Sequence, residues 1–145
     1  MSRDVYHHIL VAIEHSKADE AILDHIIPLA KLTAEKLLLV HVADGWAARH
    51  FEDLNLRESE EIRDDRAYLA RRCDELRAAG IVADSRLAMG DPATELIRIA
   101  AEERVDLIAM STHGHRLLGD LLHGTTVDRV RHTVRVPVLL LRGQA

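Results

Sequence analysis

A glycine-punctuated loop in the last third of the chain has the residue types and spacing that bind an anion. Ser111-Thr112-His113-Gly114 follows an apolar run, and Gly124-Thr125-Thr126 comes after nine intervening residues. Such a loop, leading into the start of a helix, presents several backbone N–H groups and the positive end of the helix dipole to one point. We therefore predict that this segment binds a phosphate or another anion.

The charged residues in and after this loop favour the same chemistry. Between 111 and 135 there are four arginines (Arg116, Arg129, Arg131 and Arg135) but only two aspartates (Asp120 and Asp128). This local excess of positive charge in an acidic protein suits an anionic ligand. His113 and His115 have a spacing that two metal ligands can share, but we interpret them as polar residues lining an anion pocket, because no carboxylate or cysteine partner is evident nearby.

The loop lacks the lysine of a Walker P-loop, which stands next to the Ser or Thr of that motif. All three lysines of the chain, Lys17, Lys31 and Lys36, precede the second predicted strand. We therefore expect binding of a nucleotide without efficient turnover.

Short apolar runs and longer amphipathic segments alternate along the chain. The strands and helices that they predict must position this loop. The apolar runs predict strands over 8–13, 37–42, 81–88, 106–110 and 136–141. Such runs, separated by helices, are typical of parallel strands covered on both faces. The sequence thus predicts an α/β fold: a Rossmann-like or flavodoxin-like, doubly wound sheet of five parallel strands in the order 3-2-1-4-5, with about four helices.

The helix boundaries are marked by local signals. Ser16 is the predicted N-cap of the first helix, with Asp19 in its first turn, and Pro28 predicts a kink or local break there. A second helix is predicted over 57–79. Asp91 is the predicted N-cap of the third, and the fourth opens on the Gly-Thr-Thr segment.

In this strand order the switch point lies between the first and fourth strands, and ligands bind beyond their carboxyl ends. The residues there are Glu14-His15-Ser16 and the loop that begins at Ser111. The fold prediction therefore places a site where the loop chemistry also places one. A catalytic triad of Glu14, His15 and Ser16 is not expected, since sequence neighbours at a strand end rarely face one another.

The composition bounds the class of protein. The 145 residues fit a single domain spanning 1–145, and no segment approaches the roughly 20 apolar residues that a membrane span needs. The net charge of −5 argues against broad nucleic-acid binding. The single cysteine, Cys73, excludes an intramolecular disulfide framework and fits a reducing cytoplasm; we interpret it as a packed, small hydrophobic residue.

Four segments together match one family pattern. Ile9–Ser16 (ILVAIEHS) is similar to ILVAxDxS, Leu37–Val42 (LLLVHV) to LxLLHV, and Gly90–Ala93 (GDPA) to the start of GxPAxxI. Asp106–Leu141 is similar to DLIVMGTHG…LLLGSxxxxVxxxxxxPVLVV, with many matched positions at fixed spacing. On these residues the whole chain resembles the universal stress protein (UspA-type) family.

The resemblance implies a cytoplasmic homodimer that pairs through the last strand, Val136–Leu141, and acts as a regulatory module with an unidentified protein partner. In the ATP-binding branch it implies ATP or a related adenine nucleotide, with or without Mg²⁺, in the switch-point crevice. Carried over position by position, the nucleotide-binding residues are Ala12, Ile13, Glu14, Val42, Met110, Ser111, Thr112, His113, Gly114, His115, Arg116, Gly124, Thr125 and Thr126.

Two positions depart from that branch. Ser111 stands where it has glycine, and Glu14 where it usually has aspartate. An alternative is therefore a nucleotide-free dimeric interaction protein that has lost ATP binding. A slow ATPase or autophosphorylating protein, acting through Thr125 or Thr126, is the weaker alternative. The connection from Trp46 to Leu56 is either a lid over the crevice or a dimer contact.

Overall fold

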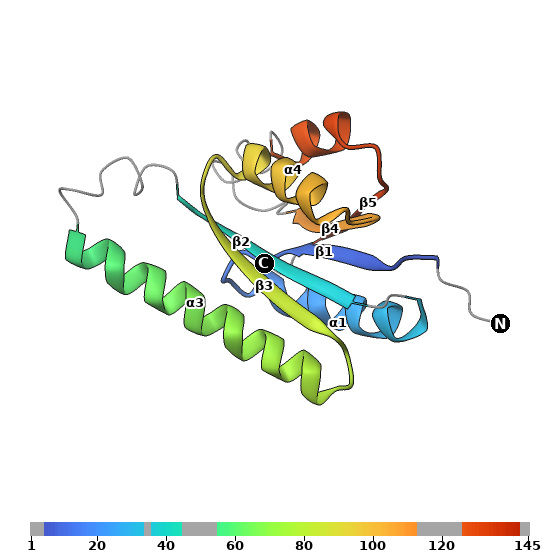
Figure 1. Ribbon diagram of the computed structural model, residues 1–145, viewed down its shortest axis with the longest axis horizontal. Helices are drawn as coiled ribbons and strands as arrows, with labels where there is room; N and C mark the ends of the chain where they lie inside the picture. The colour runs from blue at the N-terminus through green and yellow to red at the C-terminus, as the bar shows by residue number, and fades with distance from the viewer. Residues whose placement is uncertain (1–4, 34–35, 45–54, 113–125, 143–145) are drawn as a thin grey trace.

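The computed structural model describes residues 5–33, 36–44, 55–112 and 126–142. In these ranges the chain forms β1 (His8–Ala12), α1 (Ala18–Leu32), β2 (Lys36–Asp44), α3 (Asn55–Ala78), β3 (Ala83–Gly90), α4 (Pro92–Glu103), β4 (Leu107–Thr112), a helix over 126–133, and β5 (Val138–Arg142). The five strands are parallel and follow the order β3-β2-β1-β4-β5, which confirms the predicted fold class (Figure 1). No helix in the described ranges is long and apolar enough to cross a membrane.

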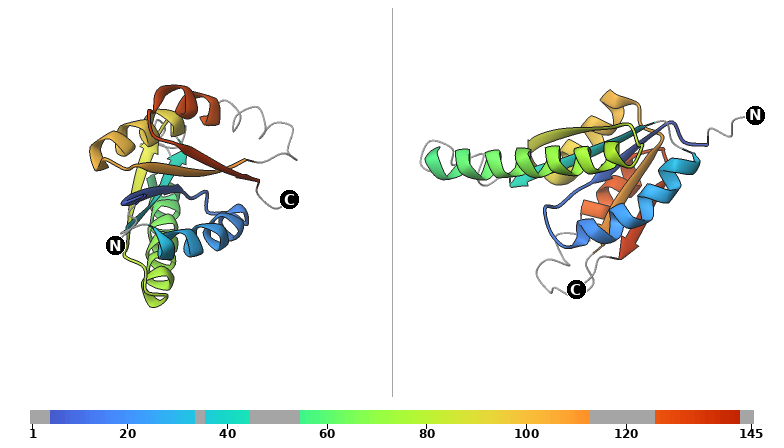
Figure 2. Two further views of the ribbon diagram at one scale, coloured as in Figure 1. Left: turned by 90° about the vertical axis from the view of Figure 1, so that its right-hand side faces the viewer. Right: turned by 90° about the horizontal axis from the view of Figure 1, so that it is seen from below.

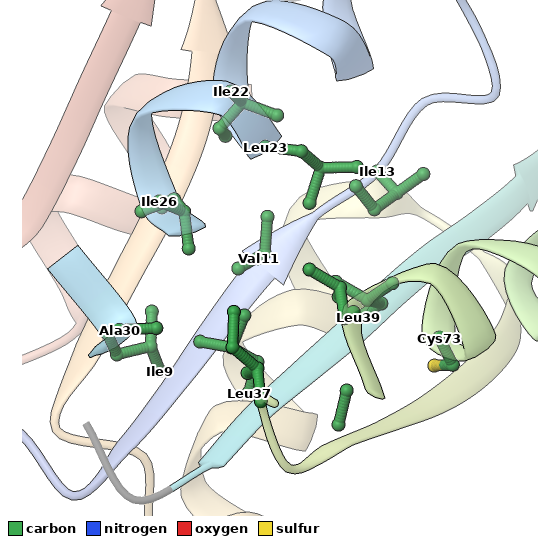
Figure 3. Packing of buried hydrophobic residues seen from close by; sticks show 14 of the residues in the cluster. Ile9, Val11, Ile13, Ile22, Leu23, Ile26, Ala30, Leu37, Leu39 and Cys73 are labelled. Atoms are coloured by element: carbon green, nitrogen blue, oxygen red, sulfur yellow. The ribbon is translucent and has the colours of Figure 1, made fainter. Parts of the chain in front are cut away.

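The sheet separates two apolar clusters because successive side chains of a strand point to opposite faces. The first cluster joins Ile9 and Val11 of β1 to α1 and α3, and Figure 3 shows part of it. The second joins Leu10 of β1 to α4 and to the helix over 126–133. Figure 2 shows these two pairs of helices on opposite sides of the sheet. Burial on both faces explains why the strands read as continuous apolar runs.

The register of the central strand fixes the place of the switch point. Val11 of β1 pairs with Leu39 of β2 on one side and with Ala109 of β4 on the other. The carboxyl ends of β1 and β4 therefore lie side by side, and the next described helices along the chain, α1 and the helix over 126–133, lie on opposite faces of the sheet (Figure 2). This is the edge at which parallel α/β sheets bind ligands.

Strand β4 extends further than the sequence predicts. Ser111 and Thr112, predicted to open the loop, are its last two residues and pair with Leu141 and Arg142 of β5. The apolar run ends at Met110, but the hydrogen-bonding partner continues beside it, so the strand continues too. The other predicted strand bounds differ from the observed ones by at most two residues.

Helix α1 departs from the prediction at two points. It is a single helix through Pro28, so the predicted local break is wrong: Ile26 and Ala30, on either side of the proline, are buried against the sheet. The N-cap position is Lys17 rather than Ser16, although the Ser16 hydroxyl accepts a hydrogen bond from the N–H of Ala18 (3.2 Å).

Two other local predictions are confirmed. Asp91 is the N-cap of α4, and its carboxylate accepts the Thr94 N–H at 2.9 Å, with Pro92 in the first turn. Cys73 is buried in the first apolar cluster, and this burial raises the pKa of its thiol. A neutral, packed thiol is a core residue rather than a nucleophile.

Candidate functional site

Three strands carry small or apolar side chains to the same edge of the sheet, on the α4 face. Met110 is buried in the second apolar cluster, and Ala12 and Val42 are partly buried against it. They come from the carboxyl ends of β4, β1 and β2, which are neighbours in the sheet. The structure thus brings together three of the residues predicted to contact a nucleoside, and they form an apolar floor at the switch point.

Ile13 and Ser111 belong to the other face. The Ile13 side chain is buried in the first cluster, and its N–H donates to the Val40 carbonyl at 2.8 Å, so this predicted residue holds the sheet together. Ser111 follows Leu107 and Ala109 in the alternation of β4 and therefore points toward the α1 face. Its side chain is one of the few polar groups buried in the described residues.

The Ser111 hydroxyl has no hydrogen-bond partner within the described part of the chain. The residue is only 5% exposed, and its Oγ atom lies out of contact with solvent. Buried hydroxyls are nearly always paired, since leaving one unpaired costs about 1–3 kcal/mol. An unpaired hydroxyl at the end of β4 is therefore unusual, and it lies on the face of the sheet opposite the apolar floor.

The loop after β1 is held by one buried carboxylate. Asp19 is fully buried, and it accepts the backbone N–H groups of Glu14 (2.8 Å), His15 (2.8 Å) and Ser16 (3.2 Å). Three consecutive N–H groups turned to one point form a concavity that suits an anion. Here the protein fills that concavity with its own side chain, so the three N–H groups are not open to a ligand.

Asp19 lies in the first turn of α1, as predicted, but its role in holding the loop after β1 was not predicted from the sequence. The available signal was an aspartate a few residues after a strand end, because such side chains often bind nearby backbone N–H groups.

The hydroxyl of Tyr68 on α3 completes the coordination of that carboxylate. It donates to Asp19 Oδ2 at 2.6 Å and accepts from Arg72 Nε at 3.1 Å. Burial of the phenol, reinforced by the hydrogen bond to Asp19, raises the pKa of Tyr68 to about 12. Arg72 in turn forms ion pairs with Glu20 of α1 and, at 3.0 Å, with Glu75 of α3. The cluster therefore ties α3 to the start of α1.

Two histidines add a second connection to α3. His15 has a positive φ of 61°, stacks on the Tyr68 ring with centroids 4.0 Å apart, and contacts Asp65 Oδ1 through Nδ1 at 2.7 Å. His41 Nδ1 lies 2.8 Å from the Ile13 carbonyl and must donate to it, while its Nε2 lies 3.4 Å from Asp65 Oδ2. His15 therefore faces Asp65 and Tyr68, an arrangement that does not form a triad with Ser16.

On the α4 face, Arg129 is engaged by the N-cap of α4. Its guanidinium donates to Asp91 Oδ2 at 2.7 Å and to Thr94 Oγ1 at 3.0 Å. Hydrogen bonds from Thr94, and then the one from Arg129, hold the pKa of Asp91 below its usual value. Arg131 pairs with Asp128 at 3.1 Å. Two of the arginines counted toward a positive field are thus paired with carboxylates, which reduces that field.

The family model of universal stress proteins matches residues 5–142, nearly the whole chain. The chain belongs to the universal stress protein family.

Individual members of this family align with this chain over nearly their full lengths. Universal stress protein MJ0577 of Methanocaldococcus jannaschii is 26% identical over 158 aligned positions, which cover 95% of this chain and 96% of that protein. The solved structure of MJ0577 superposes with a TM-score of 0.81 at 27% identity, covering 97% of this chain and 98% of that one. The five-stranded fold is therefore the fold of this family.

Two other structures of universal stress proteins contain adenine nucleotides. One, from Archaeoglobus fulgidus, is a complex with dAMP, with a TM-score of 0.67 and 19% identity over 94% of this chain and 98% of that one. Another is a complex with cAMP, with a TM-score of 0.66 and 21% identity over 94% and 97%. At these identities the likeness to this chain is one of fold.

Most of the predicted phosphate loop lies outside the described residues, namely His113, Gly114, His115, Arg116, Gly124 and Thr125. The same holds for Trp46 and most of the connection that follows it. Thr126 is the first residue of the helix over 126–133 and is half-buried. Among the residues that the structure does describe, no three His, Cys, Asp or Glu side chains are grouped to hold a metal ion.

Proposed function

We propose that this protein is a homodimeric, cytoplasmic regulatory module that binds ATP or a related adenine nucleotide at the carboxyl ends of β1 and β4. The observation that carries the proposal is the apolar floor of Ala12, Val42 and Met110. A flat base is bound by such a surface when a few polar groups around it fix the orientation. The complexes of two relatives with dAMP and cAMP support an adenine nucleotide, by analogy of fold and family.

Glu14 is the polar group that we assign to the sugar. It lies two residues beyond the end of β1, and its N–H is held by Asp19 at 2.8 Å, which fixes the backbone that carries the carboxylate. In dinucleotide-binding α/β sheets, a carboxylate near the crevice accepts a hydrogen bond from a ribose hydroxyl. Asp19 already occupies the N–H groups of the same loop. We therefore assign the binding of the phosphates to the segment before the helix over 126–133. Mg²⁺, where present, would accompany the phosphates.

The edge strand β5 supports the homodimer. In the described structure β5 pairs with β4 alone, so its other side presents unpaired backbone N–H and C=O groups. Leu140 is one of the few large hydrophobic residues exposed there. A second copy of the chain would either pair with β5 through backbone hydrogen bonds or cover this edge with side chains. The protein partner of the module would then dock elsewhere.

The direct test is to denature the purified protein and chromatograph the released small molecules, then to measure the melting temperature with added ATP and Mg²⁺. We expect an adenine nucleotide in the released fraction, or a rise in melting temperature that saturates with ATP and is smaller with GTP. Sedimentation equilibrium on the same preparation checks the dimer. An empty protein whose melting temperature does not respond to any adenine nucleotide would refute the proposal.

Ser111 distinguishes this function from the alternative of a nucleotide-free interaction protein. Ser111 points toward the α1 face, away from the apolar floor, so in a protein that binds nucleotide Ser111→Ala and Ser111→Gly should both leave the affinity for ATP close to that of wild type. Ser111→Ala should also cause no loss of stability, because the hydroxyl has no partner in the described structure. Calorimetric titration with ATP and urea denaturation measure the two effects. Tighter binding by Ser111→Gly than by wild type would instead show that the side chain obstructs the site, as the alternative requires.

A further inference from the structure

Helix α3 contacts the loop after β1 through two side chains one turn apart. Asp65 binds His15 at 2.7 Å, and Tyr68 binds Asp19 at 2.6 Å. Asp19 in turn holds three consecutive N–H groups of that loop, beginning with that of Glu14. The helix lies along β2 and β3 and reaches this loop from the side (Figure 1). A chain of two hydrogen bonds therefore joins α3 to the backbone of Glu14.

The residue before Glu14 is fixed by the same elements. The Ile13 carbonyl accepts from His41, whose other nitrogen lies 3.4 Å from Asp65. Backbone groups on both sides of the Ile13–Glu14 junction are thus bound to side chains that contact α3. The positive φ of His15, which is uncommon outside glycine, is held by this arrangement.

We propose that α3 regulates the nucleotide site by setting the position of Glu14, with His15, Asp19, Asp65 and Tyr68 as the positioning residues. None of them needs to touch the nucleotide. The proposal rests on the proposed function, because its consequence is a change in nucleotide affinity. Coupling between two sites is reciprocal, so a nucleotide held by Glu14 also steadies α3 against the sheet. A shift of α3 would first weaken the contact between Glu14 and the sugar, the part of the ligand that we assign to this residue.

Tyr68→Phe and Asp65→Asn test the two connections separately. The first removes the hydroxyl that binds Asp19, the second removes the charge that faces His15 and His41, and each keeps the shape of the side chain. Tyr6→Phe is the matched control: it removes the same hydroxyl from a tyrosine packed on the same apolar cluster, at the opposite end of β1. The readouts are hydrogen exchange of the amides of Glu14, His15 and Ser16 without nucleotide, calorimetric titration with ATP, and urea denaturation.

We expect both variants to accelerate exchange of the three amides and to weaken ATP binding, each by roughly tenfold, the size of effect that follows loss of one hydrogen bond to a charged group. Tyr6→Phe should change neither quantity. Unchanged exchange in both variants would overturn the proposal, as would a loss of affinity that the control shares. If wild type binds no nucleotide, the proposed function fails and the regulatory step fails with it, while the amide exchange still decides whether α3 positions the loop.

Discussion

Replacing Asp19 with alanine is expected to lower the free energy of unfolding by about 3–5 kcal/mol. The carboxylate is fully buried, and it accepts hydrogen bonds from three backbone N–H groups and from the Tyr68 hydroxyl. Alanine leaves all four donors without their acceptor around a fully buried position. The loss exceeds that of an ordinary hydrogen bond because unpaired buried donors bear their full desolvation cost.

Asp24→Ala provides the control for this substitution. Asp24 lies in the same helix but is exposed, so its loss should change stability by no more than about 0.5 kcal/mol. Urea denaturation of both variants and wild type gives the comparison. A loss at Asp19 below about 1 kcal/mol would mean that the loop finds other acceptors. In that case the Asp19 cluster would not be what holds Glu14 in place.

The part of the fold that was predicted from the sequence depends on local patterns. Apolar runs separated by amphipathic helices indicate buried parallel strands, and Asp91-Pro92 marks the start of α4 without any tertiary information. Ser111 shows where this reasoning stops. Its polar side chain ended the apparent strand, but β5 continues beside it and extends the hydrogen-bonded ladder. Pairing between strands decided a boundary that the residues of one strand could not show.

The candidate site, like the fold, was predicted only in part from the sequence. Ala12, Val42 and Met110 were predicted from the resemblance to the universal stress protein family, and the strand order independently placed a site at the edge where they lie. The Asp19 cluster was not predicted, because it joins residues 49 positions apart, and because the pattern of α3 does not show which turn meets the end of β1. Arg129 was counted toward a local excess of positive charge, whereas in the structure its guanidinium binds Asp91.

The stability of the protein is expected to fall by about 2 kcal/mol as the pH rises from about 10 to about 12. In the unfolded chain a tyrosine ionises near pH 10. In the folded protein burial, then the hydrogen bond to Asp19, raises the pKa of Tyr68 to about 12, because its phenolate would lie beside a carboxylate in a site only 7% exposed. Between these pH values the folded state holds one more proton than the unfolded state, so raising the pH favours unfolding. Below about pH 10 this tyrosine contributes no pH dependence.

Tyr68→Phe isolates this effect from the other groups that titrate in alkali. The chain has two tyrosines, so Tyr6→Phe leaves Tyr68 as the remaining one, and its ionisation can be followed by the ultraviolet absorbance of tyrosinate. Urea midpoints of Tyr6→Phe should fall between about pH 10 and 12 more steeply than those of the double variant, which lacks both phenols. Equal slopes would place the Tyr68 hydroxyl in contact with water. They would thereby contradict the hydrogen bond to Asp19 on which the connection between α3 and Glu14 depends.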